Sequence, residues 1–368
     1  MKLKKYLECY ISTETCNLRC HYCYITQQRK FNNKIVKFPH SIEKIKKAFS
    51  NKRLGGSCLI NLCAGGETLL SEDVILLVKA LLEENHFVML VTNGTLSKRF
   101  DEIIKFPKEI LERLIFKFSF HYLELKRLNK INEFFNNIDK IRKAGCSFTL
   151  EITPNDELIP YIEEIKDICL KKVGAYCHST IARDDRTENI DILSKYNFEE
   201  YKEIWGKLNS DLFKFKKEIF YQKREEFCYA GAWSYYINIM TGDVRQCYCE
   251  RIIDNIYKNI EQPLKEVPIG NNCSLPHCYN GHAFLSLGTI PELKTPTYAS
   301  LRNRKSLSGE EWLSTIMKNF IEQKLSENNI LYSDEKKKEI NKKNKLFNKK
   351  KQILKKIKRG LRCIITLK

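Results

Sequence analysis

The first 220 residues alternate short runs of β-branched and aromatic residues with longer amphipathic stretches. Most of the short runs are apolar at nearly every position, which is typical of strands buried on both faces of a parallel sheet. Strands are predicted at residues 6–13, 58–64, 87–93, 115–120, 147–153 and 175–182. Six strand-helix units in this order predict an α/β fold, a partial (β/α)6 TIM-like barrel with its chemistry on the loops that follow the strands.

The amphipathic stretches between the strands predict helices. In residues 71–85 the apolar positions recur at helical spacing, and Ser71 can cap the first turn. A second helix is predicted over 125–145, where Gly145 suits a left-handed C-terminal cap. A longer helix over 198–220 closes the region.

The character of the sequence changes after residue 222. Residues 228–288 are rich in Cys, Tyr, Asn and Gly and have weak periodicity. This is typical of a small loop-rich module that needs a cross-link, such as a bound metal or disulfides, to stay folded. We therefore divide the 368 residues into four predicted segments: a partial barrel (1–222), a cysteine-rich module (223–290), a helical segment (291–333) and a basic tail (334–368).

Most of the positive charge lies in the tail. The formal net charge is +19, but residues 334–368 hold 15 Lys and Arg against 3 Asp and Glu, or +12, which leaves +7 for the rest. Ile353, Ile357 and Leu361 fall at near-helical spacing, which suits an amphipathic helix on an anionic membrane surface. A solvated basic helix or a disordered arm is the alternative. Nucleic acid is not an expected partner, because no recognition fold accompanies the charge.

The sequence also indicates a compartment. It has no run of 18 apolar residues, and its N-terminus has too short an apolar stretch for a secretory signal. We therefore expect a cytoplasmic protein, peripheral to the inner face of the membrane if the tail binds there. A reducing compartment keeps thiols free, so the fifteen cysteines favour metal binding or catalysis over disulfides.

Cys16, Cys20 and Cys23 fall within eight residues, directly after the first predicted strand. A closed zinc site or an ordinary four-iron cluster needs four protein ligands. Three thiolates leave one iron open to a small molecule, and a barrel of this kind places its active site on this loop. The alternatives are a zinc site completed by His21 or by a distant ligand, and a chance group of buried thiols.

This C-x3-C-x2-C pattern, with the aromatic Tyr22 before the last cysteine, resembles the signature of the radical S-adenosylmethionine (SAM) superfamily. The resemblance implies a [4Fe-4S] cluster on Cys16, Cys20 and Cys23 whose open iron binds SAM. It also implies reductive cleavage of SAM to a 5′-deoxyadenosyl radical, which abstracts hydrogen from a substrate C–H bond. A flavodoxin or ferredoxin is the expected electron donor.

Two further strand ends fit the same resemblance. The segment AGGET (64–68) follows the second strand, where the superfamily holds the SAM amino group, and VTNGT (91–95) follows the third. Each motif alone is an ordinary turn, so their value lies in their register along successive strands. The cofactor-binding residues that the resemblance implies are Tyr22, Gly65, Gly66, Glu67, Thr92, Asn93 and Arg183.

Other residues near strand ends are candidates for the chemistry itself. His121 after the fourth strand could relay a proton, and Glu151 in the fifth is a second catalytic candidate. Arg183 after the sixth could meet the SAM carboxylate or an anionic substrate. For each of them an ordinary, satisfied barrel residue is the alternative.

The spacing of Cys228, Gly242 and Cys247 resembles the opening of the SPASM auxiliary-cluster domain. Fewer cysteines follow than in that domain, so we expect a shortened, twitch-like module with a second [4Fe-4S] cluster. The ligands that the resemblance implies are Cys228, Cys247, Cys273 and Cys278, with Cys249 as a spare. His277 and His282 remain possible ligands, and a zinc ribbon on the same cysteines is the alternative.

Together these features predict a radical SAM enzyme that oxidises, epimerises or crosslinks its substrate. The substrate is a saccharide or other small molecule, or a peptide. The first predicted strand begins at residue 6, which leaves no room for a peptide-binding N-terminal extension and favours the small molecule. The alternative is a non-enzymatic zinc adaptor whose basic tail contacts nucleic acid or a membrane.

Overall fold

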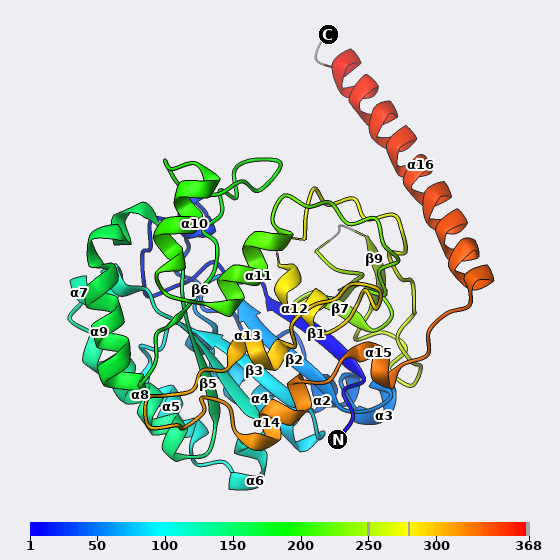
Figure 1. Ribbon diagram of the computed structural model, residues 1–368. Coiled ribbons are helices and arrows are strands. Elements are labelled where there is room, and N and C mark those ends of the chain that lie inside the picture. Colours follow the sequence, from blue (N-terminus) through cyan, green and yellow to red (C-terminus); the bar gives the residue numbers. More distant parts are fainter. Residues whose placement is uncertain (249–250, 279, 366–368) are drawn as a thin grey trace.

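The computed structural model describes residues 1–248, 251–278 and 280–365, with side chains as far as residue 350. Its described strands form one sheet in the order β6-β5-β4-β3-β2-β1-β7-β8-β9 (Figure 1). Neighbours from β6 to β7 pair in parallel, whereas β8 and β9 pair antiparallel. The strands are β1 (Lys5–Ile11), β2 (Cys58–Ala64), β3 (Phe87–Thr92), β4 (Leu114–Ser119), β5 (Ser147–Ile152), β6 (His178–Ser179), β7 (Ser234–Asn238), β8 (Asp243–Arg245) and β9 (Ile252–Asn255).

Helices connect the parallel strands, and further helices follow the sheet. Those up to the end of the predicted barrel are α1 (Tyr24–Gln27), α2 (Ile42–Ala48), α3 (Asn51–Leu54), α4 (Asp73–Glu83), α5 (Ser97–Ile103), α6 (Lys108–Leu111), α7 (Tyr122–Arg127), α8 (Ile131–Lys143), α9 (Ile162–Val173), α10 (Phe198–Gly206) and α11 (Asp211–Ile219). The later ones are α12 (Gly281–Ser286), α13 (Tyr298–Arg302), α14 (Thr315–Ile321), α15 (Leu325–Asn328) and α16 (Asp334–Ile365). Short 3-10 helices lie at Thr68–Leu70 and Asp156–Tyr161.

The predicted α/β class and parallel barrel strands are confirmed. Five of the six predicted strands lie within two residues of the observed bounds. The sixth, predicted over 175–182, is a strand only at His178–Ser179. The sheet also continues beyond the predicted barrel, because β7 pairs in parallel with β1 over Tyr6–Tyr10. The division of the chain into four segments stays a prediction.

Three helix predictions are corrected. Ser71 does not cap α4 with its side chain, since the N-cap is Glu72 and no side chain accepts a hydrogen bond there. The predicted helix over 125–145 breaks into α7 and α8 at Asn129, whose positive φ of 54° no helix tolerates. The predicted helix over 198–220 likewise breaks into α10 and α11, where Asn209 has a positive φ and Ser210 caps α11.

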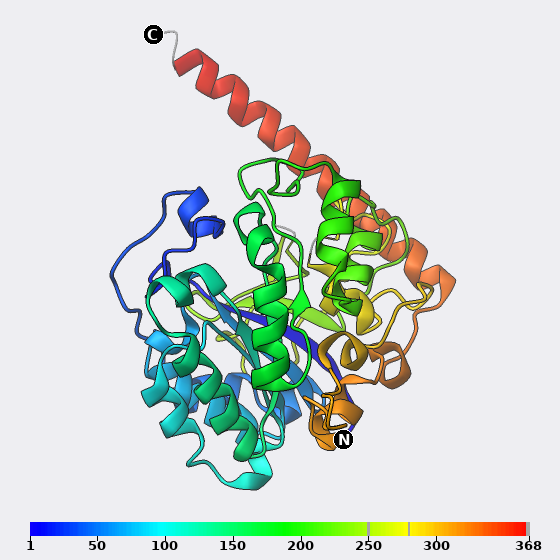
Figure 2. The ribbon, with the colours of Figure 1, turned by 60° about the vertical axis from the view of Figure 1, so that its left-hand side comes forward.

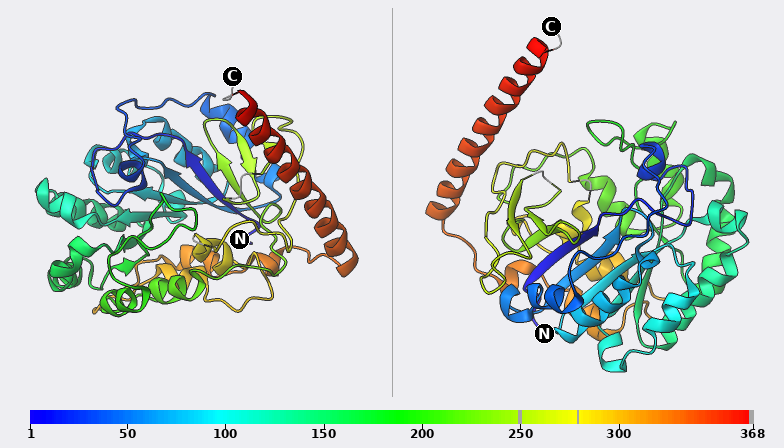
Figure 3. Two further views of the ribbon diagram at one scale, coloured as in Figure 1. Left: turned by 90° about the horizontal axis from the view of Figure 1, so that it is seen from above. Right: turned by 180° about the vertical axis from the view of Figure 1, so that it is seen from behind.

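The two faces of the sheet pack against different parts of the chain. Alternate residues of β1, Leu7, Cys9 and Ile11, share one core with α2, α4, α5, α8 and α9 (Figure 2). The opposite face packs against α12, α13, α14 and α15 in a second core that includes Tyr6 (Figure 3). There the Phe320 ring stacks on Phe87 at a centroid distance of 3.6 Å. The helical segment therefore closes the open side of the barrel.

The basic tail is helical from Asp334 to Ile365 and projects away from the rest of the chain after its first turns (Figures 1 and 3). Asn344 ties its start to the preceding chain, because Nδ2 donates to the carbonyl oxygens of Pro268 and Ile269. Within the described residues, no helix is both long and apolar enough to span a membrane. The apolar tail positions named above lie beyond the described side chains, and membrane binding stays a prediction.

Candidate active site

The loop with the three cysteines runs from the end of β1 to the start of α1. Cys23 is the N-cap of α1, and its backbone N–H donates to the carbonyl of Cys20 at 3.2 Å. The Thr26 hydroxyl donates to the same carbonyl at 2.8 Å. The Leu18 N–H donates to the Sγ atom of Cys16 at 3.4 Å. These contacts hold the three thiols on one tight loop.

Gly65 and Gly66, at the end of β2, lie directly against this loop. A Cβ atom would sit 1.7 Å from the Thr15 carbonyl oxygen if placed on Gly66, and 2.1 Å from that of Thr13 if placed on Gly65. The Glu67 N–H donates to the Thr15 carbonyl at 3.0 Å. The two glycines therefore allow the cysteine loop to approach the end of β2. Their predicted contact with SAM stays a prediction.

Replacing Gly66 by alanine should therefore displace the cysteine loop. We expect Gly66→Ala to lower the free energy of unfolding by at least about 3 kcal/mol, since its Cβ meets backbone rather than a movable side chain. Chemical denaturation measures the change. Gly206→Ala, at the end of α10, is the matched control because no atom lies within 4 Å of its added Cβ. Equal stability of the two variants would contradict the close approach.

Glu67 joins the ends of β2 and β3. Its carboxylate is buried and accepts from the Thr92 hydroxyl at 2.7 Å and the Asn93 N–H at 2.7 Å. The Leu69 N–H donates a third bond at 3.0 Å. Burial raises the pKa of Glu67, and these hydrogen bonds oppose the rise. Glu67 thus fixes the backbone of Asn93 beside the cysteine loop.

The side chain of Asn93 holds the first cysteine. Its Nδ2 donates to Asn17 Oδ1 at 2.7 Å and lies 3.8 Å from the Sγ atom of Cys16. The Thr95 hydroxyl donates to Asn93 Oδ1 at 2.7 Å and accepts from Asn17 Nδ2 at 2.7 Å. The end of β3 is thereby tied to the cysteine loop by a closed ring of three side chains.

The three thiols face one pocket of about 490 Å³, mouth included. The other predicted site residues that line it are Gly65, Gly66, Glu67, Thr92, Asn93 and His121. Burial raises the pKa of all three thiols, to about 11 for Cys16. A bound cationic centre stabilises the thiolate form. The donor set and the space beside it fit an iron-sulfur cluster.

Tyr22 and His121 form a pair at the edge of this pocket. The Tyr22 hydroxyl lies 2.6 Å from Nδ1 of His121. Burial lowers the pKa of His121 to about 4 and raises that of Tyr22 well above its usual value. At neutral pH the histidine is therefore uncharged and the phenol is protonated, and the tautomer of His121 sets which of the two is the donor.

Residues 10–167 match the family model of the Radical SAM superfamily. The chain carries a radical SAM domain. This domain contains the cysteine loop and the ends of β2 and β3, and it implies a [4Fe-4S] cluster and SAM as cofactors. The radical SAM recognition made from the three motifs is confirmed.

The fold resembles that of a solved structure. The crystal structure of Streptococcus suis SuiB bound to S-adenosylmethionine is similar at 14% identity with a TM-score of 0.50, and the match covers 71% of this chain and 65% of the SuiB chain. Native anSMEcpe with bound AdoMet matches at 16% identity and a TM-score of 0.47, covering 69% of this chain and 78% of that one. No curated protein is similar enough in sequence to count as a relative. The likeness to SuiB shows the fold alone.

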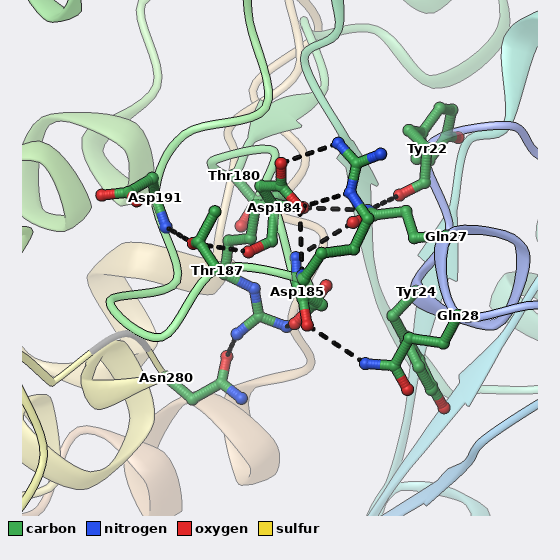
Figure 4. Close-up of polar contacts among 12 residues, drawn as sticks. Tyr22, Tyr24, Gln27, Gln28, Thr180, Asp184, Asp185, Thr187, Asp191 and Asn280 are labelled. Carbon is green, nitrogen blue, oxygen red and sulfur yellow. Dashed lines mark hydrogen bonds and ion pairs between the residues drawn. The ribbon is translucent and has the colours of Figure 1, made fainter.

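The loop after β6 lies against α1, which follows the cysteine loop (Figure 4). Gln27 of α1 donates from Nε2 to the carbonyls of Tyr22 and Arg183, at 2.8 and 3.0 Å, and accepts from the Asp185 N–H at 3.0 Å. Gln28 Nε2 donates to the Asp185 carbonyl at 3.2 Å. The residues that follow the cysteine loop therefore position the segment with Arg183.

Glu151 lies on the inner face of β5 and is only 5% exposed. It forms ion pairs with Arg302 of α13 and with Lys117 Nζ of β4, the latter at 3.1 Å. Burial and the nearby charge of Arg302 lower the pKa of Lys117 to about 7. Two cations thus compensate the charge of the buried carboxylate. The catalytic role of Glu151 stays a prediction.

Sequence reasoning missed four residues beside this site: Lys117, Lys216, Arg302 and His282 as a pocket residue. Lys117 interrupts the apolar run IFKFSF, and a charge within an apolar run is the signal that could have found it. Lys216 lies in FKFKKEIF, which has as many charged as apolar residues and gives no such signal. Arg302 and His282 lie in stretches whose pattern carries no such signal.

The four cysteines assigned to the auxiliary cluster come together outside the matched radical SAM region. Burial raises the pKa of Cys228 to about 12, and the charge of Cys273 raises it further. Burial and then the charges of Cys278 and Cys228 raise the pKa of Cys247. A Cβ atom on Gly281 would lie 2.7 Å from the Sγ of Cys278, so this glycine lets the chain pass close to the thiol. Four neighbouring thiols, one buried and three partly buried, fit a cluster.

Other auxiliary candidates are placed differently. The His277 ring packs 4.3 Å from that of Phe220, and His282 lines a pocket with Arg183. Cys249, the predicted spare ligand, lies outside the described residues. Among the side chains described in residues 1–248, 251–278 and 280–350, no three His, Cys, Asp or Glu are arranged so that they could hold a metal ion.

Proposed function

We propose that this protein is a radical SAM enzyme that cleaves SAM reductively and abstracts hydrogen from an unreactive substrate C–H bond. One observation carries the proposal: three thiols of one loop share a pocket with Glu67 and Asn93, at the carboxyl ends of three adjacent parallel strands. Active sites of parallel barrels lie at this edge.

Cys16, Cys20 and Cys23 would hold the cluster. A [4Fe-4S] cluster bound there supplies an electron that breaks the SAM sulfonium and yields the hydrogen-abstracting 5′-deoxyadenosyl radical. Asn93 and Asn17 orient the loop, and the glycines at the end of β2 leave room for it. The neutral His121, hydrogen-bonded to Tyr22, can accept or return a proton beside the substrate.

We further propose that Cys228, Cys247, Cys273 and Cys278 hold a second, closed [4Fe-4S] cluster. Asn280 supports a connection to the active site, because it follows Cys278 by two residues and accepts from Arg183 Nη1 at 3.0 Å. The substrate is a small molecule or a peptide, and the electron donor is a flavodoxin or ferredoxin. Oxidation, epimerisation and crosslinking all begin with the same hydrogen abstraction.

Anaerobic purification tests both cluster assignments. We expect about eight irons and eight sulfides per chain in the wild type, since each cluster holds four. Alanine at Cys16, Cys20 and Cys23 should remove about half of this iron, and alanine at Cys228, Cys247, Cys273 and Cys278 the other half. Cys146→Ala is the control, as this buried thiol lies in neither group. Colourless protein that holds zinc and leaves SAM intact would overturn the proposal.

A further inference from the structure

A second pocket adjoins the cysteine pocket and shares Cys23, Ser119 and His121 with it. It measures about 790 Å³, mouth included, and its walls come from β4, β5, the segment after β6, α11 and α12. A molecule bound there lies beside the site of SAM cleavage. The inference below rests on the proposed function, which places the substrate in this pocket.

Cations outnumber carboxylates on the walls of this pocket. Lys117, Arg183 and Lys216 are set against Glu151 and Asp185. Lys117 contacts Glu151 at 3.1 Å, and an Nη atom of Arg183 lies 3.9 Å from Asp185. Glu151 is already shared with the buried Arg302 behind the wall. The carboxylates present therefore leave positive charge uncompensated.

Lys216 is the group that lacks a counterion. It projects from α11, is only 4% exposed, and donates to the Thr180 hydroxyl. Among the described residues, no carboxylate lies within ion-pair distance of its Nζ atom. A buried ammonium without an anion is costly, and burial accordingly lowers the pKa of Lys216 well below its usual value, with Arg183 and Lys117 adding to the shift.

His282 of α12 adds a second unused group to the same pocket. It is 9% exposed, and its Nδ1 atom has no hydrogen-bond partner within the described part of the chain. In folded proteins, buried polar atoms are usually paired. An unpaired imidazole nitrogen and an ammonium without a counterion on one pocket both point to a ligand that supplies their partner.

We propose that this pocket binds an oxyanion of the substrate, a carboxylate or a phosphate group, with Lys216 as its counterion and Arg183 and Lys117 beside it. Binding of the anion favours protonation of Lys216 and gives the resulting buried ammonium its partner. It also anchors the substrate with its reactive C–H bond toward the cysteine pocket. Lys216 is thus a substrate-positioning residue.

Calorimetric titration of the full-length protein with inorganic phosphate and, separately, with acetate tests the proposal at fixed ionic strength. We expect saturable binding of one equivalent, at least about tenfold weaker in Lys216→Met. Lys214→Met is the matched control, because Lys214 lies on the same helix, is half exposed and pairs with Asp211. Binding of phosphate alone identifies a phosphate substrate, and binding of acetate as well identifies a carboxylate.

Proton uptake provides a second readout. Titrations in two buffers of different ionisation enthalpy should show proton uptake on anion binding, because the depressed pKa of Lys216 returns toward its usual range. The uptake should fall in Lys216→Met. If Lys216→Met does not fold, Arg183→Gln tests the same pocket, because Arg183 is a partly exposed loop residue. This variant should also bind the anion more weakly.

Three outcomes overturn the proposal: binding no stronger than that of chloride, equal binding in Lys216→Met and wild type, or complete displacement of phosphate by SAM, which would assign the cations to the SAM carboxylate. SAM cleavage is measured on the same preparation. Cleavage without anion binding rejects this inference and keeps the enzyme, whereas anion binding without iron or cleavage rejects the proposed function.

Discussion

Alanine at Cys16, Cys20 and Cys23 together is expected to abolish reductive SAM cleavage, with a loss of at least about 1,000-fold. The reason is that the three thiols line one pocket and are its only thiolate donors among the described lining residues. The measurement is 5′-deoxyadenosine formed per chain under anaerobic reduction, by liquid chromatography. The iron of the auxiliary cysteines should remain and shows that the variant is folded.

The single variants sharpen this test. Because three ligands act as a unit, each of Cys16→Ala, Cys20→Ala and Cys23→Ala should lose nearly as much activity as the triple variant. Cys146→Ala, which changes a buried thiol outside the pocket, should keep wild-type turnover. Turnover in the triple variant comparable with that of the wild type would contradict the assignment of these thiols.

The part of the site that the sequence predicted is the part built from local spacing. Cys16, Cys20 and Cys23 come together because they share one short loop, and the glycines and Asn93 join them because parallel strands end at one edge. Apolar runs were sufficient to place five strands, since each is buried on both faces. The cysteine spacing needed no long-range contact, and the strand ends needed only the expected order of neighbouring parallel strands.

The part that the sequence could not predict depends on contacts between distant segments. Arg302 meets Glu151 across 151 positions, from a helical segment that the sequence analysis left without a role. The parallel pairing of β7 with β1 likewise joins the cysteine-rich segment to the barrel. Helix breaks at Asn129 and Asn209 were missed because asparagine in a left-handed conformation leaves no mark in the apolar periodicity.

These distant contacts change how the candidate residues are understood. Glu151 was selected for catalysis from its place near a strand end. In the structure it forms ion pairs with Lys117 and Arg302, and Lys117 lines the pocket beside it. Arg183, selected as an anion contact, lines the same pocket. Asn280, which precedes α12, also lines the pocket and accepts a hydrogen bond from Arg183. The pocket proposed for the substrate and Cys278, a proposed cluster ligand, are therefore close to each other along the chain.

The buried ion pair of Glu151 and Arg302 is expected to contribute strongly to the stability of the fold. We expect Arg302→Met to lower the free energy of unfolding by about 3 kcal/mol, because it removes one partner of a buried ion pair and leaves the other charged. The cost lies at the lower end of the range for such pairs since Lys117 still contacts Glu151. Denaturant unfolding measures it.

Two variants isolate the cause of this loss. Arg142→Met removes an exposed ion pair with Glu310 and should change stability by less than about 1 kcal/mol. Glu151→Leu combined with Arg302→Met replaces both charges by apolar groups and should recover much of the lost stability, because no unpaired carboxylate remains and burial favours the neutral form of Lys117. If the double variant is less stable than Arg302→Met alone, Glu151 stabilises the fold through Lys117, and Arg302 is not its main partner.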